Sequence, residues 1–229
     1  MLESQIQPPY QGQDGLGSDN VPGLSRLESA AFFGAYPLAH IDFHDSSLSV
    51  QVQLDAFSPF IPHDTEDSGL PVAMLHYHVT NPGRVTAKVS IAFSIENPIF
   101  PGLPSEDHAK KAEVRPNEYQ TGNNLAGLYM SNPAVSATDP MHGSFALAAM
   151  AGSNIEVSHW LGWPQERWWN APLLFWDQFS KEGRLTDQPE PHSAVGSLCL
   201  QTTIAPGSSA DFRFLLGWHF PNRTPEWCG

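Results

Sequence analysis

The sequence predicts an antiparallel β-sandwich with long loops and little helix, and three observations support this fold class. Several segments alternate apolar and polar residues with the two-residue period of strands that bury one face. The 21 prolines and 18 glycines of the 229-residue chain supply many turns between these segments. Helix-forming patterns are scarce, so most strands follow one another without a helix between them.

The N-terminal half contains three strand patterns, in residues 47–57, 72–80 and 85–95. The turn Asn81-Pro82-Gly83-Arg84 predicts that the second and third of these strands form a hairpin, because Pro presets φ and Gly accepts a positive φ. Apolar faces of the first and third strands, with one strand near the C-terminus, are predicted to share a core made of Val50, Val52, Leu54, Val89, Ile91, Phe93, Phe212, Phe214 and Leu216.

The C-terminal half repeats the pattern in residues 197–204 and 212–220, which are joined by a turn at residues 205–208. One helix is expected at Pro172–Gly183, with Pro near its start and Gly at its end. Weaker strands are expected in residues 36–43, 127–131 and 144–151. Residues 98–124 are expected to form a long irregular loop.

Composition excludes several function classes. Eleven basic against 24 acidic residues give a net charge of -13, which disfavours nucleic acids and anionic membranes as partners. No run of about 18 apolar residues predicts a transmembrane segment. Residues 1–13 lack a signal-peptide core, and Cys199 and Cys228 fit two unpaired thiols, so a cytoplasmic location is expected.

Two groups of ionisable side chains were weighed as sites. His76 and His78 share one strand face and could bind a metal, but no third ligand stands at a recognised spacing, so surface or packed histidines are expected. The acidic loop at residues 63–67 is expected to cap turns and not to supply a catalytic carboxylate pair. No cofactor, metal or catalytic residue is predicted, since nucleophile, phosphate-binding and zinc motifs are missing.

Five of the seven tryptophans crowd into one stretch of 17 residues. Aromatic rings are typical of cores, of domain interfaces and of surfaces that stack on sugars. Core packing with a domain interface is one interpretation and direct sugar contact the other, and the candidate residues are Trp160, Trp163, Trp168, Trp169 and Trp176.

Several stretches resemble the N-terminal β-sandwich domain of glycoside hydrolase family 116, the glucosylceramidase-like β-glucosidases. They occur in family order from about residue 27 to residue 229, and they include Phe57-Ser58-Pro59-Phe60-Ile61-Pro62, Glu66-Asp67-Ser68-Gly69-Leu70-Pro71, Met130-Ser131-Asn132-Pro133, Thr138-Asp139-Pro140-Met141-His142-Gly143, Pro172-Leu173-Leu174-Phe175-Trp176 and Trp218-His219-Phe220-Pro221.

The resemblance implies a non-catalytic domain, because the family's nucleophile Glu and acid/base Asp lie in a downstream (α/α)6 barrel that this chain lacks. We expect a loop or frayed segment at residues 1–26 and a sandwich at residues 27–229 that is incomplete at its N-terminus. The implied partners are the downstream helical barrel and, through it, a β-glucoside or glycolipid substrate. The alternative is a stand-alone carbohydrate-binding or protein-interaction sandwich, because a fold does not fix a function.

Overall fold

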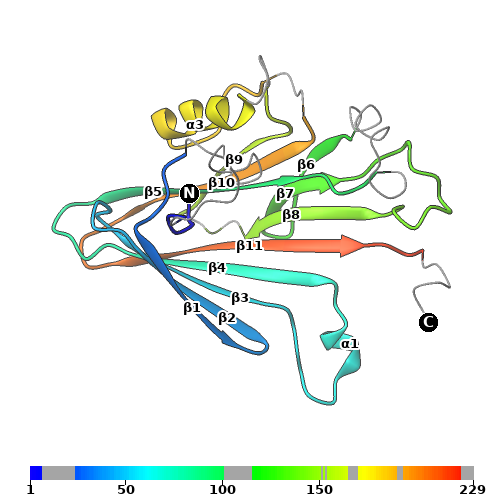
Figure 1. The fold of residues 1–229 in the computed structure, drawn as a ribbon, viewed down its shortest axis with the longest axis horizontal. Helices are drawn as coiled ribbons and strands as arrows, with labels where there is room; N and C mark the ends of the chain where they lie inside the picture. The colour runs from blue at the N-terminus through cyan, green and yellow to red at the C-terminus, as the bar shows by residue number, and fades with distance from the viewer. Residues whose placement is uncertain are drawn as a thin grey trace.

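The computed structural model describes residues 1–6, 24–100, 115–150, 152, 154–164, 170–189 and 193–222. In these residues the chain forms two antiparallel sheets, one of eight strands and one of three (Figure 1). The fold class predicted from the sequence is therefore confirmed.

The large sheet has the strand order β1-β2-β3-β4-β11-β8-β7-β6. In that order its strands are β1 (Ser29–Ala35), β2 (Leu38–His44), β3 (Gln51–Phe57), β4 (Val72–Thr80), β11 (Ser209–His219), β8 (Ser144–Met150), β7 (Leu125–Met130) and β6 (Asn117–Gly122). The small sheet has the order β5 (Ala87–Glu96), β10 (Val195–Ile204) and β9 (Glu156–Trp160).

Three layers result from this arrangement. Helix α3 (Ala171–Glu182) lies over the small sheet, and the small sheet covers part of one face of the large sheet (Figure 1). The short helix α1 (Thr65–Ser68) lies in the loop that joins β3 to β4, beyond the ends of those strands. Neither described helix therefore covers the outer face of the large sheet, the face turned away from the small sheet.

The main core lies between the two sheets. All nine residues predicted for it are there, which confirms the strand faces inferred from the alternation. Phe214 is central to it, because its ring lies 6.1 Å from Tyr77 edge-on and 5.7 Å from Phe93. The fully buried side chains of this layer include Val79, Leu128, Met130, Leu147, Leu198, Leu200, Phe212 and Phe214.

The predicted hairpin between residues 72–80 and 85–95 is wrong. β4 pairs with β3 and β11 in the large sheet, whereas β5 pairs with β10 in the small sheet. The turn thus carries the chain from one sheet to the other. Buried Asn81 fixes this crossing, since its side-chain amide donates to Val85 O at 2.8 Å and to Ile204 O at 3.0 Å.

The second turn, at residues 205–208, makes the same crossing from β10 to β11. Gly207 has φ 68°, as a turn glycine should, and its N–H donates to Asn81 O at 2.9 Å. Asn81 N–H in turn donates to Ser208 O at 2.9 Å. The two crossings are therefore joined by hydrogen bonds, which the sequence of neither turn predicts by itself.

Some strand boundaries also differ from expectation. The strand expected at 47–57 begins at Gln51, because Asp45 accepts from Ser47 N–H and holds a turn there. Val85 is 75% exposed and precedes β5. β6 lies inside the predicted irregular loop at 98–124, of which residues 101–114 are outside the described residues. β1, β6 and β9 were not predicted, because their short sequences show no clear alternation.

The helix expected at 172–183 is confirmed as α3. Pro172 occupies its first turn, where the missing N–H costs nothing. Gly183 ends it in the left-handed conformation with φ 66°, and its N–H donates to Phe179 O at 2.8 Å.

Candidate interaction surfaces

Two of the five candidate tryptophans pack beneath α3, Trp160 as a buried residue and Trp163 as a partly buried one. Trp160 is only 3% exposed, and its indole N–H donates to Thr186 O at 2.9 Å. Trp163 stacks on Phe175 with ring centroids 4.8 Å apart, and its indole N–H donates to Ser197 Oγ at 2.7 Å. Both rings thus pack against Phe175, and both indole N–H groups find an acceptor within the chain.

The other three candidates lie on α3 itself or outside the described residues. Trp176 on α3 is half-buried, with its ring 6.2 Å from Phe179. Trp168 and Trp169 lie outside the described residues. A role for the tryptophan segment in a domain interface or in sugar contact stays a prediction.

Cys199 is a packing residue of the same cluster. It is buried and free, and burial raises the pKa of its thiol to about 11. A thiol with such a pKa stays protonated at neutral pH, so Cys199 is a poor nucleophile. Cys228, the second thiol, lies outside the described residues.

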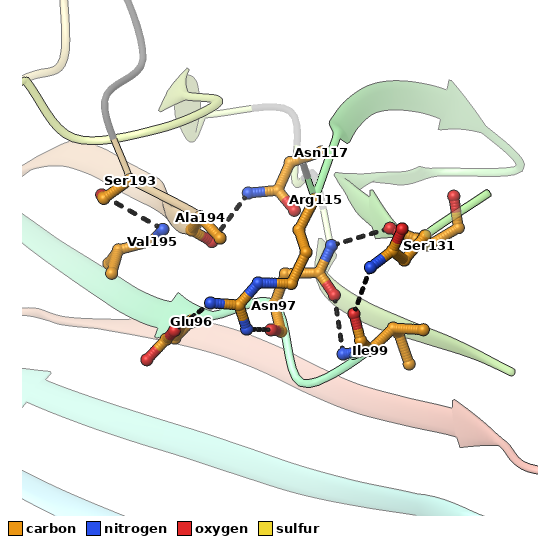
Figure 2. A network of polar contacts seen from close by, with 10 residues as sticks. Glu96, Asn97, Ile99, Arg115, Asn117, Ser131, Ser193, Ala194 and Val195 are labelled. Atoms are coloured by element: carbon orange, nitrogen blue, oxygen red, sulfur yellow. Dashed lines mark hydrogen bonds and ion pairs between the residues drawn. The ribbon is translucent and has the colours of Figure 1, made fainter. Parts of the chain in front are cut away.

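A polar network closes the end of the sandwich where β5, β6 and β10 meet (Figure 2). The Arg115 guanidinium bridges the Glu96 carboxylate and the Asn97 carbonyl oxygen. Buried Asn97 donates to Ser131 O at 3.0 Å, and its amide oxygen accepts from Ile99 N–H at 2.9 Å. Asn117 donates to Leu161 O and Ala194 O. These bonds satisfy backbone groups at strand ends, which is a structural role.

The acidic loop has the capping role expected from its sequence. The Asp64 carboxylate accepts from Glu66 N–H at 3.1 Å and from Asp67 N–H at 2.9 Å, as the N-cap of α1. Glu66 and Asp67 are exposed in the first turn, where the helix dipole favours negative charge.

The outer face of the large sheet carries a polar ladder across β2, β3, β4 and β11, on which His76 and His78 share a face as predicted. It consists of His40, Asp42, Gln53, Asp55, His76, His78, Asp211 and Arg213, and adjacent members are paired across strands. His40 Nδ1 lies 2.7 Å from Asp55 Oδ1, and His78 Nδ1 lies 2.8 Å from Asp211 Oδ1. His76 Nε2 is 3.1 Å from the same Asp211 oxygen but has no well-oriented hydrogen-bond partner.

The pairing shifts the titration of the polar ladder. Hydrogen bonds to Asp55 and Asp42 raise the pKa of His40 above its ordinary value. Partial burial acts to raise the pKa of Asp211, but the hydrogen bond of His78 and the close approach of the His76 imidazole outweigh it and hold that pKa below its usual range. Within the described residues, no group of histidine, cysteine and carboxylate side chains is arranged to hold a metal ion.

Beside the polar ladder the same sheet face carries a second, apolar part, which sequence reasoning missed. Side chains of β2, β3, β4, β11 and β8 form one cross-strand row, in which Leu38 pairs with Phe57, Phe57 with Met74, Met74 with Leu215, and Leu215 with Ala148. We call the whole surface the outer apolar face, and its residues are Leu38, Phe57, Val72, Met74, Leu125, Tyr129, Ala146, Ala148, Met150 and Leu215.

The boundary between the two parts runs through the middle of two strands. The first half of β4 reads Val-Ala-Met-Leu and its second half alternates histidine with apolar residues. β11 shows the reverse order, with alternation first and Leu-Leu-Gly-Trp afterwards. β8 is apolar on both faces along almost its whole length, a pattern typical of strands that are buried on both sides. The unbroken apolar run of β8 was the feature of the sequence that could have predicted this apolar surface.

Two hollows were considered as binding sites. One of about 360 Å³ lies on the small sheet, and one of about 300 Å³ lies beside the polar ladder. The carboxylates that line them are Glu156 in the first and Asp42 in the second. Hydrolysis of a glycoside uses two carboxylates that flank the bond, so neither hollow has the arrangement of a glycosidase site.

None of the helices in the described part of the chain is long and apolar enough to span a membrane.

Two likenesses to known proteins are found, one to a solved structure and one to a family model. A solved structure titled "Putative kojibiose phosphorylase from human microbiome" is similar over 83% of this chain and 19% of that chain, with 8% identity and a TM-score of 0.37. The chain therefore spans about a fifth of that protein's length. A family model described as "beta-glucosidase 2, glycosyl-hydrolase family 116 N-term" matches residues 5–228. The match confirms the resemblance seen in the sequence, and the chain belongs to glycosyl-hydrolase family 116 as its non-catalytic N-terminal domain.

Proposed function

We propose that this domain supports the catalytic domain of a retaining β-glycosidase that cleaves β-glucosides or glucosylceramide. The observation that carries the proposal is the family match over residues 5–228. The geometry agrees with a supporting role, because the Asp64 carboxylate of the acidic loop caps a helix and the two hollows each offer one carboxylate. The pair of catalytic carboxylates and the sugar site then belong to the catalytic domain.

The test compares two proteins. The 229-residue chain and the polypeptide that carries this domain together with its catalytic domain are each incubated with an aryl β-glucoside and with glucosylceramide. We expect turnover by the longer polypeptide alone. Turnover by the 229-residue chain that is lost in Asp64→Asn or Glu66→Gln would move catalysis into this domain and overturn the proposal. Cleavage of α-glucosides only, by the longer polypeptide, would overturn the substrate class.

A further inference from the structure

We propose that the outer apolar face is the docking surface for the catalytic domain of the same polypeptide, and this rests on the proposed function for the identity of that domain. Several side chains of this face are exposed to solvent. Leu38, Leu125, Tyr129 and Met150 are 56%, 40%, 38% and 43% exposed, although they lie side by side with other apolar residues on regular strands. Contiguous apolar surface of this kind marks an interaction site.

The outer face of the large sheet is divided into a polar part and an apolar part on the same strands. Strands β4 and β11 each change from one-sided to two-sided apolar sequence at the same register, where Met74 pairs with Leu215. Folding of the domain alone needs apolar residues only on the inner face of both strands. The change in mid-strand therefore records a partner that covers one part of the outer face and leaves the polar ladder in water.

The shape of the surface fits another protein domain. Its centre is built from small residues on β7 and β8, where Ala148 pairs with Gly127. Gly127 has no room for a side chain, because a Cβ there would lie 2.4 Å from Leu147 O. Nearly flat apolar rows allow the backbone or apolar side chains of a partner to approach closely.

The chemistry of the surface argues against other occupants. A sugar needs several converging hydrogen-bond partners, and among the residues of the outer apolar face only Tyr129 offers a side-chain polar group. An anionic membrane would be repelled by a net charge of -13, and the face includes no Lys or Arg to attract it. An apolar protein surface remains as the fitting partner.

The path of the chain points to a covalently linked partner. β11 contributes Leu215 to the outer apolar face and ends only four residues later, at His219. Asn222 then anchors the chain, because its amide donates to Ala137 O at 2.7 Å and to Asp139 O at 2.8 Å. A domain that follows β11 is thus tethered at the edge of this surface, and tethering raises its effective concentration there.

Cysteine labelling tests the proposal directly. Ala148→Cys places a thiol on the outer apolar face, and Gln51→Cys places a matched thiol on the polar part of the same sheet face. Both are made in the Cys228→Ser background, since Cys199 is buried. Each variant is labelled with a maleimide in the 229-residue chain and in the polypeptide that also carries the catalytic domain.

We expect the Ala148→Cys thiol to react at least about ten-fold more slowly in the longer polypeptide, and the Gln51→Cys thiol to react within about two-fold in both. Equal rates for Ala148→Cys would overturn the proposal. So would protection of Ala148→Cys in the 229-residue chain that grows with protein concentration, because the occupant would then be a second copy. Ala146→Cys repeats the test if Ala148→Cys disturbs the fold.

The outcomes separate this proposal from the proposed function. Protection of Ala148→Cys in a polypeptide that cleaves no β-glucoside would support docking and contradict the function. An active polypeptide with an unprotected Ala148→Cys thiol would support the function and contradict docking.

Discussion

The aromatic cluster beneath α3 and the outer apolar face are both rich in apolar side chains, but only the first is covered by the chain itself. Trp160 and Phe175 beneath α3 are 3% and 8% exposed, whereas Leu38 on the outer face is 56% exposed. The tryptophans beneath α3 have their indole N–H groups paired within the domain. Residue type alone therefore does not identify an interface, whereas apolar side chains that stay exposed on a regular sheet do.

The largest loss of stability is expected for a core residue that both sheets cover. Ile91→Asp places a charge in the core between the two sheets, where Ile91 is 7% exposed. A buried unpaired carboxylate should lower the free energy of unfolding by about 4 kcal/mol or more. Chemical denaturation measures it, and parent-like stability would mean that the register of β5 is wrong.

A smaller effect separates the two regions of the comparison. Phe175→Ala removes a ring that lies 6.0 Å from Trp160 and 4.8 Å from Trp163, so we expect a loss of about 3 kcal/mol. Leu38→Ala on the outer apolar face, in the 229-residue chain, should change stability by no more than about 0.5 kcal/mol. Equal losses in the two variants would show that the outer face is already covered within the chain.

The smallest effect on stability is expected on the polar part of the outer face. The pKa of His40 is raised in the fold by Asp55 and Asp42, so protonated His40 favours folding. This stabilisation is present in full below the unfolded pKa of about 6.5 and is lost as pH rises through the folded pKa. His40→Gln should therefore lose stability relative to the parent at pH 5.5 and little at pH 8.5.

An NMR titration checks the cause. Asp55→Asn removes the largest contribution to the shift, and the His40 pKa should then move down toward its ordinary value. Gln51→Ala, also on the polar part of this face, should leave the titration of His40 unchanged. A His40 titration curve that is the same in all three proteins would show that the polar ladder is not formed in solution.

Most of the sandwich could be predicted from the sequence because one-sided burial leaves a two-residue period. All nine predicted core residues lie between the sheets, and the helix at 172–183 was marked by Pro172 and Gly183. Partner choice between strands was not predictable. The turn at residues 81–84 has the composition of a hairpin, but the contacts of Asn81 with Ile204 and Ser208 make it a crossing between sheets.

The candidate surface was harder to predict than the fold. Tryptophan-rich sequence is typical of cores as well as of interfaces, and only the structure shows that Trp160 is buried and that Trp163 stacks on Phe175. The outer apolar face is formed by residues from six strands that are distant in sequence, so no single stretch reveals it. The apolar run of β8 was its one local sign, and such a run alone fits a strand buried by any neighbour.

Binding of a fluorescent hydrophobic dye to the 229-residue chain shows whether the outer apolar face is the uncovered surface of this domain. Two variants are compared with the parent, Leu38→Glu combined with Ala148→Glu on the outer apolar face, and Trp176→Ala on α3. If the outer face is the uncovered surface, the double variant should lose most of the dye fluorescence and the α3 variant should keep it. Loss of dye binding in Trp176→Ala with full binding by the double variant would contradict the account and assign the bare surface to the tryptophan segment.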